Sequence, residues 1–270
     1  LGTGVGLSGT TLVSGTSADF TIAANDSLTV NKLTANAVCT GADDEVEINA
    51  AFATVGAGGR VVLLEGTFVI EGEIAFTTHN QTLEGQGYGT FLNGDAVIDG
   101  QNVIAVDTTN NCRIKNLRIQ SADGGGNVVH CINVEGSSNG LLIENVTITD
   151  SDSDGIHIED DTIYDVQIHD CHIENADDYG IFVDMNSGQY AYRIHIKDNT
   201  IVDTGNDGIH FGPTGAGSHY ALVTDNVIAT SGGDGIELRD APYGIITGNT
   251  VVSSTGHGII VPASNFVTVA

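Results

Sequence analysis

The chain has 270 residues and a mass of 27.9 kDa, and its 8 Lys+Arg against 35 Asp+Glu give a formal net charge of −27. So acidic a chain is a poor partner for nucleic-acid phosphates or an anionic membrane face, and no apolar run is long enough to span a bilayer. Hydrophobic residues make up 40% of the chain, which excludes a disordered acidic tail, while 36 Gly, 3 Pro and no Trp favour short strands joined by many turns.

The first 38 residues have the pattern of a small β appendage or linker. Apolar and polar residues alternate in three short stretches, at 11–13, 20–22 and 28–30, and small polar residues separate them. Alternation with a period of two indicates strands. We therefore place a domain boundary between residues 38 and 39 and assign no chemistry to the first segment.

One helix is expected in the whole chain, over about residues 43–55. Asp43 or Asp44 can cap its N-terminus, and acidic residues in the first turn suit the helix dipole. The apolar residues that share one face are Ile48, Phe52 and Val55. Two short strands are expected after it, at 61–64 and 68–70.

From about residue 112 the chain repeats a Gly-Ile-x-apolar phrase about every 25 residues. The copies begin at Gly155, Gly180, Gly208, Gly235 and Gly258, and a degenerate copy begins at Cys131. Each unit has too little apolar surface to fold alone, so this period predicts a solenoid of stacked β-coils. Stacking places Asn199, Asn226 and Asn249 in register, where inward amides can hydrogen-bond one another.

Here the chain resembles the pectin-lyase-like superfamily, which includes polygalacturonases and phage tailspikes. The likeness rests on the entry region, residues 42–70, and on the repeats with their Asn column. It implies an all-β fold, a single-stranded right-handed parallel β-helix solenoid with a short N-terminal capping helix, over residues 39–270. The fold alone does not give the activity, because hydrolases, lyases, epimerases, tailspikes and scaffolds share it.

The residue before each Gly is polar or aromatic and forms one column. Its members are Asp154, Tyr179, Asp207, Asp234 and His257. Because strands of neighbouring coils lie about 4.8 Å apart, two carboxylates one or two coils apart suit the acid and base of glycoside cleavage. The competing interpretation is that Asp-Gly is copied for its turn geometry.

The resemblance to polygalacturonases implies roles for three of these residues. Asp207 then positions the attacking water, Asp234 is the general acid, and His257 tunes both. The chain departs from the family pattern, because Gly235 replaces the second Asp of the middle motif and no Arg-x-Lys follows.

The outward position two residues after each Gly supplies candidate substrate contacts. It reads His157, Phe182, His210, Glu237 and Ile260. We expect His210, Glu237 and the nearby Arg239 to bind substrate, and Arg239 is the nearest basic group that a lyase could use.

A metal site is expected where acidic residues alternate at Asp150, Asp152 and Asp154. Oxygen-rich loops of this kind bind Ca²⁺, and the stretch resembles half of a calcium loop. The twelfth loop position holds Asp161 and not the Glu of a complete loop. An acidic turn open to water is the alternative.

Two further patterns have mainly structural interpretations. Aromatic residues recur near one turn, at Tyr164, Tyr192, Tyr220, Tyr243 and Phe266, with a one-residue slip between Tyr192 and Tyr220. Such a row can bind sugar faces, but we favour a stack that seals a corner of the core. Cys39, Cys112, Cys131 and Cys171 form no CxxC pair and are expected to be buried free thiols.

Together these features predict an extracellular, cell-surface or virion protein that hydrolyses or eliminates a polysaccharide along the solenoid face. The alternative is a non-catalytic glycan-binding or structural module, such as a phage tailspike. The negative charge disfavours a strongly anionic polymer unless Ca²⁺ bridges it. We expect no nucleic-acid partner and no membrane span. The open solenoid end suggests either a truncated chain or a homo-oligomer that covers that end, a trimer if the protein is tailspike-like.

Overall fold

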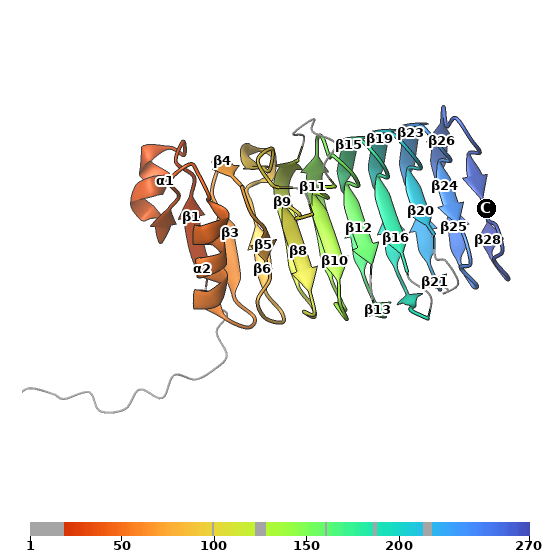
Figure 1. Cartoon of the computed structure of the whole chain (residues 1–270), viewed down its shortest axis with the longest axis horizontal. Helices are drawn as coiled ribbons and strands as arrows, with labels where there is room; N and C mark the ends of the chain where they lie inside the picture. The colour runs from red at the N-terminus through yellow and green to blue at the C-terminus, as the bar shows by residue number, and fades with distance from the viewer. Residues whose placement is uncertain (1–18, 99, 122–127, 160, 186–187, 213–217) are drawn as a thin grey trace, which may run out of the picture.

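The structure is a computed structural model that describes residues 19–98, 100–121, 128–159, 161–185, 188–212 and 218–270. All strand pairs are parallel, and successive coils stack along one long axis with helix α2 at the N-terminal end (Figure 1). The protein is therefore a parallel β-helix, as the repeat period predicts.

Three sheets form the walls of the solenoid. The large sheet contains β1 (Asp19–Ala23), β2 (Ala37–Val38), β3 (Arg60–Leu63), β4 (Gly66–Val69), β6 (Thr82–Glu84), β7 (Thr90–Asn93), β9 (Arg113–Gln120), β11 (Leu142–Ile148), β14 (Gln167–His169), β15 (His172–Ala176), β18 (His195–Lys197), β19 (Thr200–Thr204), β22 (Leu222–Thr224), β23 (Val227–Ser231), β25 (Ile245–Thr247), β26 (Thr250–Val252) and β28 (Thr268–Val269). The eight-stranded sheet contains β5 (Ile74–Ala75), β8 (Ile104–Asp107), β10 (Ile132–Glu135), β12 (Ile156–Glu159), β16 (Ile181–Asp184), β20 (Ile209–Phe211), β24 (Ile236–Leu238) and β27 (Ile259–Ile260). The three-stranded sheet contains β13 (Ile163–Tyr164), β17 (Ala191–Tyr192) and β21 (Ser218–His219).

The large sheet bends at one position in each coil, and residues in the left-handed region make the bend. In β9 and β11 the strand runs through it at Asn116 (φ 58°) and Asn145 (φ 52°). In later coils Asp170, Asp198 and Asp225 have φ of 56°, 55° and 57° and separate two strands. Asn and Asp tolerate this conformation better than other non-Gly residues. Because every coil turns at the same place, equivalent residues stay in register.

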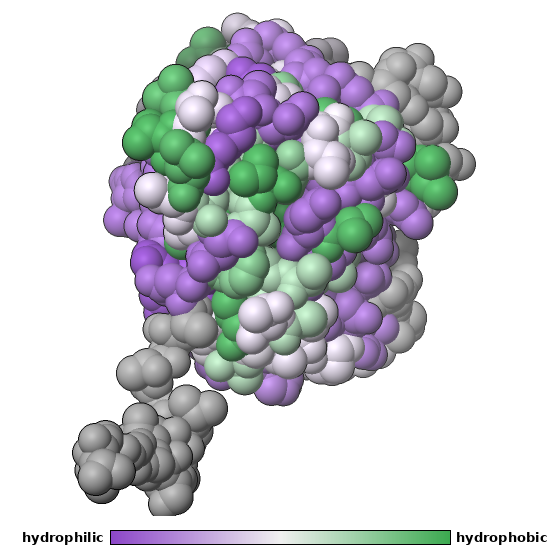
Figure 2. Space-filling model, turned by 90° about the vertical axis from the view of Figure 1, so that its left-hand side faces the viewer, coloured by the Kyte–Doolittle hydropathy of each residue, from purple (hydrophilic) through white to green (hydrophobic). Residues whose placement is uncertain are grey.

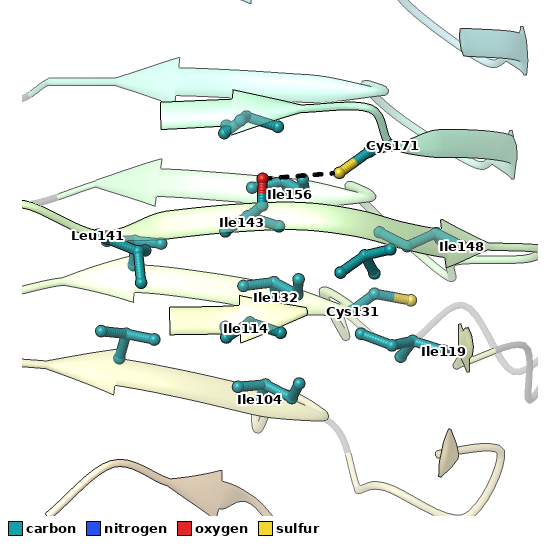
Figure 3. Packing of buried hydrophobic residues seen from close by; sticks show 14 of the residues in the cluster. Ile104, Ile114, Ile119, Cys131, Ile132, Leu141, Ile143, Ile148, Ile156 and Cys171 are labelled. Carbon is teal, nitrogen blue, oxygen red and sulfur yellow. Dashed lines mark hydrogen bonds between the residues drawn. The ribbon is translucent and has the colours of Figure 1, made fainter. Parts of the chain in front are cut away.

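The core is a set of aliphatic columns inside the coils. Ile104, Ile132 and Ile156 are register partners on three neighbouring strands and are fully buried (Figure 3). All four cysteines are free and buried, as expected, and the Cys171 thiol donates to the carbonyl of Ile143 (Figure 3).

The predicted Asn column is confirmed. The amide Nδ2 of Asn199 donates to Oδ1 of Asn226 at 3.0 Å, and Nδ2 of Asn226 donates to Oδ1 of Asn249 at 2.9 Å. The same oxygens also accept backbone N–H groups, so the column satisfies buried polar groups at one corner.

The N-terminal region confirms one prediction and corrects two. Helix α2 (Glu45–Val55) buries Ile48 and Phe52, as its pattern predicts. Asp44 stands at the N-cap but does not cap the helix, because its carboxylate accepts the N–H groups of Gly41 and Val69 instead. The expectation of a single helix was wrong. The described residues also form helix α1 (Thr29–Thr34) and the 3₁₀ turn η1 (Gly87–Gly89).

The segment before residue 39 contacts the solenoid directly. Strand β1 pairs with β3 and β2, so it extends the large sheet at its N-terminal end. The stretch 28–30, expected as a strand, lies largely in α1, and the stretch 11–13 lies outside the described residues. The boundary at residue 38 stays a prediction.

The N-terminal end of the solenoid is polar with scattered hydrophobic patches (Figure 2). Exposed apolar residues in this region include Leu28, Val30, Leu33 and Val46. In the described part of the chain, no helix is long and apolar enough to cross a membrane.

Candidate functional site

The outward face of the eight-stranded sheet carries the polar column that the repeats predict. Its members are register partners on successive strands: Asn133, His157, Phe182, His210 and Glu237. Isoleucines alternate with them and point into the core, because side chains of a strand point to opposite faces in turn. A single row of imidazole, amide, carboxylate and aromatic groups therefore runs along this wall.

The turn just before these strands carries a second column, which forms a hydrogen-bond ladder between coils. Each rung is a backbone N–H that donates to the equivalent side chain of the preceding coil. The rungs are Asp154 N to His130 Nδ1 (3.2 Å), Tyr179 N to Asp154 Oδ1 (2.9 Å), Asp234 N to Asp207 Oδ1 (2.6 Å), and His257 N to Asp234 Oδ1. One carboxylate oxygen of each Asp thus joins two neighbouring coils. This supports the interpretation that the Asp before Gly is repeated partly for structural reasons.

The second oxygen of Asp154 and of Asp207 contacts a histidine three residues later. Nδ1 of His157 lies 2.5 Å from Oδ2 of Asp154, and Nδ1 of His210 lies 2.5 Å from Oδ2 of Asp207. Both carboxylates are buried. A carboxylate on Nδ1 orients the imidazole and leaves Nε2 for other partners, which is the arrangement of an acid-base or metal-binding histidine.

The Asp207 pair belongs to a cluster that we call the distal centre: Asp207, His210, Glu237 and Arg239. Oε2 of Glu237 lies 3.4 Å from His210 Nδ1, and the Arg239 guanidinium lies 2.6 Å from Oε1 of Glu237. The hydrogen bond from Arg239 to Glu237 raises the pKa of the guanidinium above its usual value. The structure therefore brings together the expected substrate residues and one expected catalytic residue.

The other two expected catalytic residues adjoin this centre. Asp234 is linked to Asp207 by the ladder, and the exposed ring of His257 lies 3.0 Å from the Asp234 carboxylate. Their roles stay a prediction.

The Asp154 pair belongs to a second cluster, the proximal centre: Asn133, Asp154, His157 and Glu159, with His130 beneath it. It borders a pocket of about 400 Å³. Burial lowers the pKa of His130 to about 4. Burial also opposes protonation of His157, but its hydrogen bond to Asp154 and the nearby carboxylates outweigh this and raise its pKa.

Sequence reasoning missed His130, Asn133 and Glu159. His130 and Asn133 lie in or just before the degenerate copy, where Cys131 replaces the marker Gly. The phrase Asp-Gly-Ile-His occurs at 154–157 and again at 207–210 and could have marked the two Asp–His pairs. Glu159 lies two residues after the first copy, on the same side of the strand.

Aromatic rings separate the two centres. The Phe182 ring centroid lies 5.1 Å from those of His157 and His210, and the Tyr179 ring stacks on Phe182 at 4.4 Å. Burial raises the pKa of Tyr179, and the carboxylates of Asp207 and Asp154 add to the effect. The two histidines thus share one half-buried aromatic partition.

The predicted calcium trio is not gathered into one cluster. Asp150 Oδ1 accepts from the amide of Asn175, whereas Asp154 points to histidines. Among the described residues, Asp154 groups with His130 and His157, with ligand atoms within 4.8 Å, and not with Asp150 and Asp152. A Ca²⁺ ion at this stretch stays a prediction.

The aromatic row forms a stack with the predicted slip. Tyr192 pairs in register with His219, so Tyr220 is displaced by one residue. The ring pairs Tyr164–Tyr192, Tyr220–Tyr243 and Tyr243–Phe266 are stacked at 5.0–5.4 Å. Inner rings cover one another's faces, so the row offers mainly ring edges to a sugar.

A second hollow, of about 520 Å³, lies along another edge of the solenoid and is lined by small polar residues such as Thr204 and Ser231. None of its lining residues belongs to a described group of three His, Cys, Asp or Glu side chains with close ligand atoms. Among the described residues, two of the four groups of this kind lie on the eight-stranded sheet or in the turn just before it, and both contain a histidine paired with a buried Asp, so we place the candidate site there.

Solved structures with the same fold come from proteins of several kinds. The chain is similar to a lacto-N-biosidase from Eubacterium ramulus (TM-score 0.68, 13% identity, 92% of this chain and 55% of that one). It is also similar to ORF18 of Geobacillus virus E2 (0.51, 12%, 83% and 56%) and to a pectate lyase from Bacillus sp. N165 in complex with trigalacturonate (0.50, 12%, 90% and 82%).

The chain spans about half the length of the first two structures, and identities of 12–13% show a shared fold alone. No curated protein sequence matches it. The right-handed β-helix region family matches residues 66–215 and, in an overlapping match, 102–270. With the parallel stacking of its coils, this match shows that the chain belongs to the right-handed β-helix family.

Proposed function

We propose that the protein binds a glycan along the outward face of the eight-stranded sheet and cleaves it at the distal centre. The observation that carries the proposal is the gathering of Asp207, His210 and Glu237, whose reactive atoms lie within 4.8 Å of one another. Repetition of Asp-Gly for turn geometry does not account for His210 and Glu237, which lie on the strands.

The arrangement of Glu237 and His210 favours hydrolysis with a covalent intermediate. In retaining glycosidases one group attacks the anomeric carbon while a second, nearby group protonates the leaving oxygen. Oε2 of Glu237 and Nδ1 of His210 lie 3.4 Å apart. Glu237, paired with Arg239, forms a bond to the anomeric carbon while the glycosidic C–O bond breaks. Protonated His210, held by Asp207, gives its proton to the leaving oxygen. Water then adds its OH to the carbon while the bond between that carbon and Glu237 breaks, which restores the Glu237 carboxylate, and the remaining proton of the water passes to His210.

In this proposal Asp234 and His257 support the centre through the ladder. Asp234 donates its N–H to Asp207 and so fixes the carboxylate that orients His210. His257 does the same for Asp234 one coil later. Both are positioning residues and do not touch the reacting bond.

Charge indicates the class of glycan. Arg239 is the only Lys or Arg that lies in, or directly after, a described strand of the eight-stranded sheet. Carboxylates are abundant on the same wall, so we propose a neutral polymer, with strongly anionic polymers requiring Ca²⁺ as a bridge.

The named neighbours support a carbohydrate partner. Two of the three are enzymes named for glycan substrates, and the third belongs to a virus. We propose an extracellular, cell-surface or virion location on the same grounds, with a homo-oligomer, a trimer if tailspike-like, as an accompanying hypothesis.

A non-catalytic glycan-binding module is the second candidate. The ladder favours it, because one oxygen of Asp154, Asp207 and Asp234 is occupied in joining coils. The aromatic partition of Tyr179 and Phe182 provides apolar surface for a sugar in either case.

The test is a reducing-end assay on neutral and acidic polysaccharides, with and without Ca²⁺. We expect cleavage of a neutral glycan and loss of nearly all cleavage for Glu237→Gln, because the amide cannot form the covalent intermediate. Glu144→Gln, on the large sheet, is the matched control and should be unchanged. Ultraviolet absorbance of an unsaturated product would indicate elimination. Binding without cleavage by any variant would establish the second candidate.

A further inference from the structure

The pocket at the proximal centre contains two buried polar atoms with no hydrogen-bond partner among the described residues. They are Nε2 of His157 and Oδ1 of Asn133, on side chains of residues that are 7% and 2% exposed. A buried polar atom without a partner costs about 1–3 kcal/mol. Since His157 and Asn133 are register partners on β12 and β10, both atoms belong to one small region of the pocket wall.

The other nitrogen of His157 is already engaged. Nδ1 contacts Asp154 Oδ2 at 2.5 Å, which fixes the ring. In the neutral form of the imidazole with its proton on Nδ1, Nε2 has the free lone pair that a metal ion can bind. Metal-binding histidines nearly always have their second nitrogen on a carboxylate or carbonyl in this way.

A carboxylate lies at the distance that a shared ion requires. Oε2 of Glu159 is 3.6 Å from Nε2 of His157, too far for a hydrogen bond. An ion about 2.1 Å from each atom fits between them with an angle of roughly 120°. Oε1 of Glu159 accepts from the Asn133 amide at 3.2 Å, which holds the carboxylate in place.

The surrounding charge favours a cation. Glu159 is in register with Asp184 on β16, and His157 and Asn133 lie beside them on the same wall. The pocket lining contains Asp154, Glu159 and Asp178 but no Lys or Arg. All eight Lys and Arg of the chain lie in described segments, so none is hidden near the pocket outside them.

We propose that this pocket binds one divalent first-row transition-metal ion, with His157 Nε2 and Glu159 as ligands and Asn133 Oδ1 as a third donor. Water completes the coordination. One imidazole with two oxygens suits Zn²⁺ or Mn²⁺ better than Ca²⁺, which prefers oxygen ligands alone. The site is separate from the distal centre, where Nδ1 of His210 already faces two carboxylates.

The test is calorimetric titration of the EDTA-dialysed full chain with Zn²⁺, Mn²⁺ and Ca²⁺ in separate runs. We expect one Zn²⁺ per chain in the micromolar range or tighter. His157→Ala and Glu159→Gln should each weaken binding at least about tenfold, and Asp154→Asn about 10- to 100-fold. His169→Ala is the matched control, because His169 also lies beside carboxylates but on the more exposed large sheet.

Two further measurements keep the result interpretable. Glu159 is only partly buried, so Glu159→Gln should keep the circular dichroism spectrum and melting temperature of the metal-free protein. Histidine ¹⁵N spectra should show a zinc-induced shift at Nε2 of one ring, absent in His157→Ala. Burial raises the pKa of the Cys131 and Cys171 thiols to about 12, which disfavours their thiolate forms in the folded protein.

Three results would overturn the proposal. They are no saturable Zn²⁺ or Mn²⁺ binding by folded protein, unchanged binding in His157→Ala and Glu159→Gln, and Ca²⁺ bound more tightly than either transition metal. None depends on glycan cleavage, so the metal site and the proposed function succeed or fail separately.

Discussion

Two coils carry the same four residues, Asp-Gly-Ile-His, at 154–157 and 207–210, yet the two histidines have different surroundings. His210 has Glu237 beside it on the next strand, so two carboxylates face one nitrogen. His157 has Phe182 on that side and Asn133 on the other, and its Nε2 lies at a pocket. The four-residue phrase itself produces the Asp–His pair, and the residues on the neighbouring coils determine the chemistry that is open to that pair.

Substitution of the two histidines should give the largest contrast. We expect His210→Gln to lower the glycan cleavage rate by about 10² or more, because it removes the proposed proton donor. His157→Gln should change the rate by less than about fivefold, since it lies outside the reacting centre. Initial rates at saturating glycan measure both. Equal losses would place the chemistry across both centres and contradict our assignment.

Separate substitution of Asp154 and Asp207 by Ala should lower the free energy of unfolding by different amounts. Asp154→Ala leaves the Tyr179 N–H and His157 Nδ1 without their acceptor, at a cost of about 3 kcal/mol. Asp207→Ala should cost less, about 2 kcal/mol, because Glu237 still contacts His210. Urea unfolding of the metal-free variants gives both values. A larger loss for Asp207→Ala would show that Glu237 does not compensate.

The contrast explains what could be predicted from the sequence. The repeats predict the register, so the column from His157 to Glu237 and the adjacency of Asp207, Asp234 and His257 follow from period two and coil stacking alone. The Asp–His contact spans only three residues, so the phrase itself encodes it.

What the sequence conceals depends on neighbouring coils. His130 and Asn133 belong to a copy that lacks the marker Gly, and their importance appears only when His157 is stacked on them. In the ladder one oxygen of an Asp accepts a backbone N–H of the next coil. Every residue type except Pro has such an N–H, so the sequence does not reveal this hydrogen bond. Helix α1 has no side-chain cap and no buried residue, so its pattern resembled that of a strand.

A pH titration should distinguish the centres further. Among the described residues, only the proximal centre has a second buried histidine, His130, beside the histidine of its strand, His157. The pKa of His130 is lowered to about 4, so its stabilising contribution is present above pH 6.5 and is lost as the pH falls through about 4. Asp154 and His157 are the charged neighbours that modify this value. The loss amounts to up to about 3 kcal/mol.

The variant that tests this is His130→Asn. Asn keeps an acceptor for the Asp154 N–H, as Asn102 does for His130 in the coil before, but it does not titrate. Unfolding free energies of the metal-free protein at pH 7 and pH 4 should differ less in the variant. An unchanged pH dependence would mean that His130 is protonated in the fold at little cost.

Among the residues of the two centres, the smallest effect should come from Arg239, the cation that the distal centre has and the proximal centre lacks. Its ion pair with Glu237 is half exposed on the arginine side, so Arg239→Gln should cost less than about 1 kcal/mol and less still at high salt. Arg193→Gln, which breaks an exposed pair with Asp165, is the control and should cost less again. The difference arises because Glu237 is buried, and a buried carboxylate that loses its cation is poorly solvated. Equal effects in thermal unfolding would show that water reaches Glu237 and that Arg239 serves only the substrate.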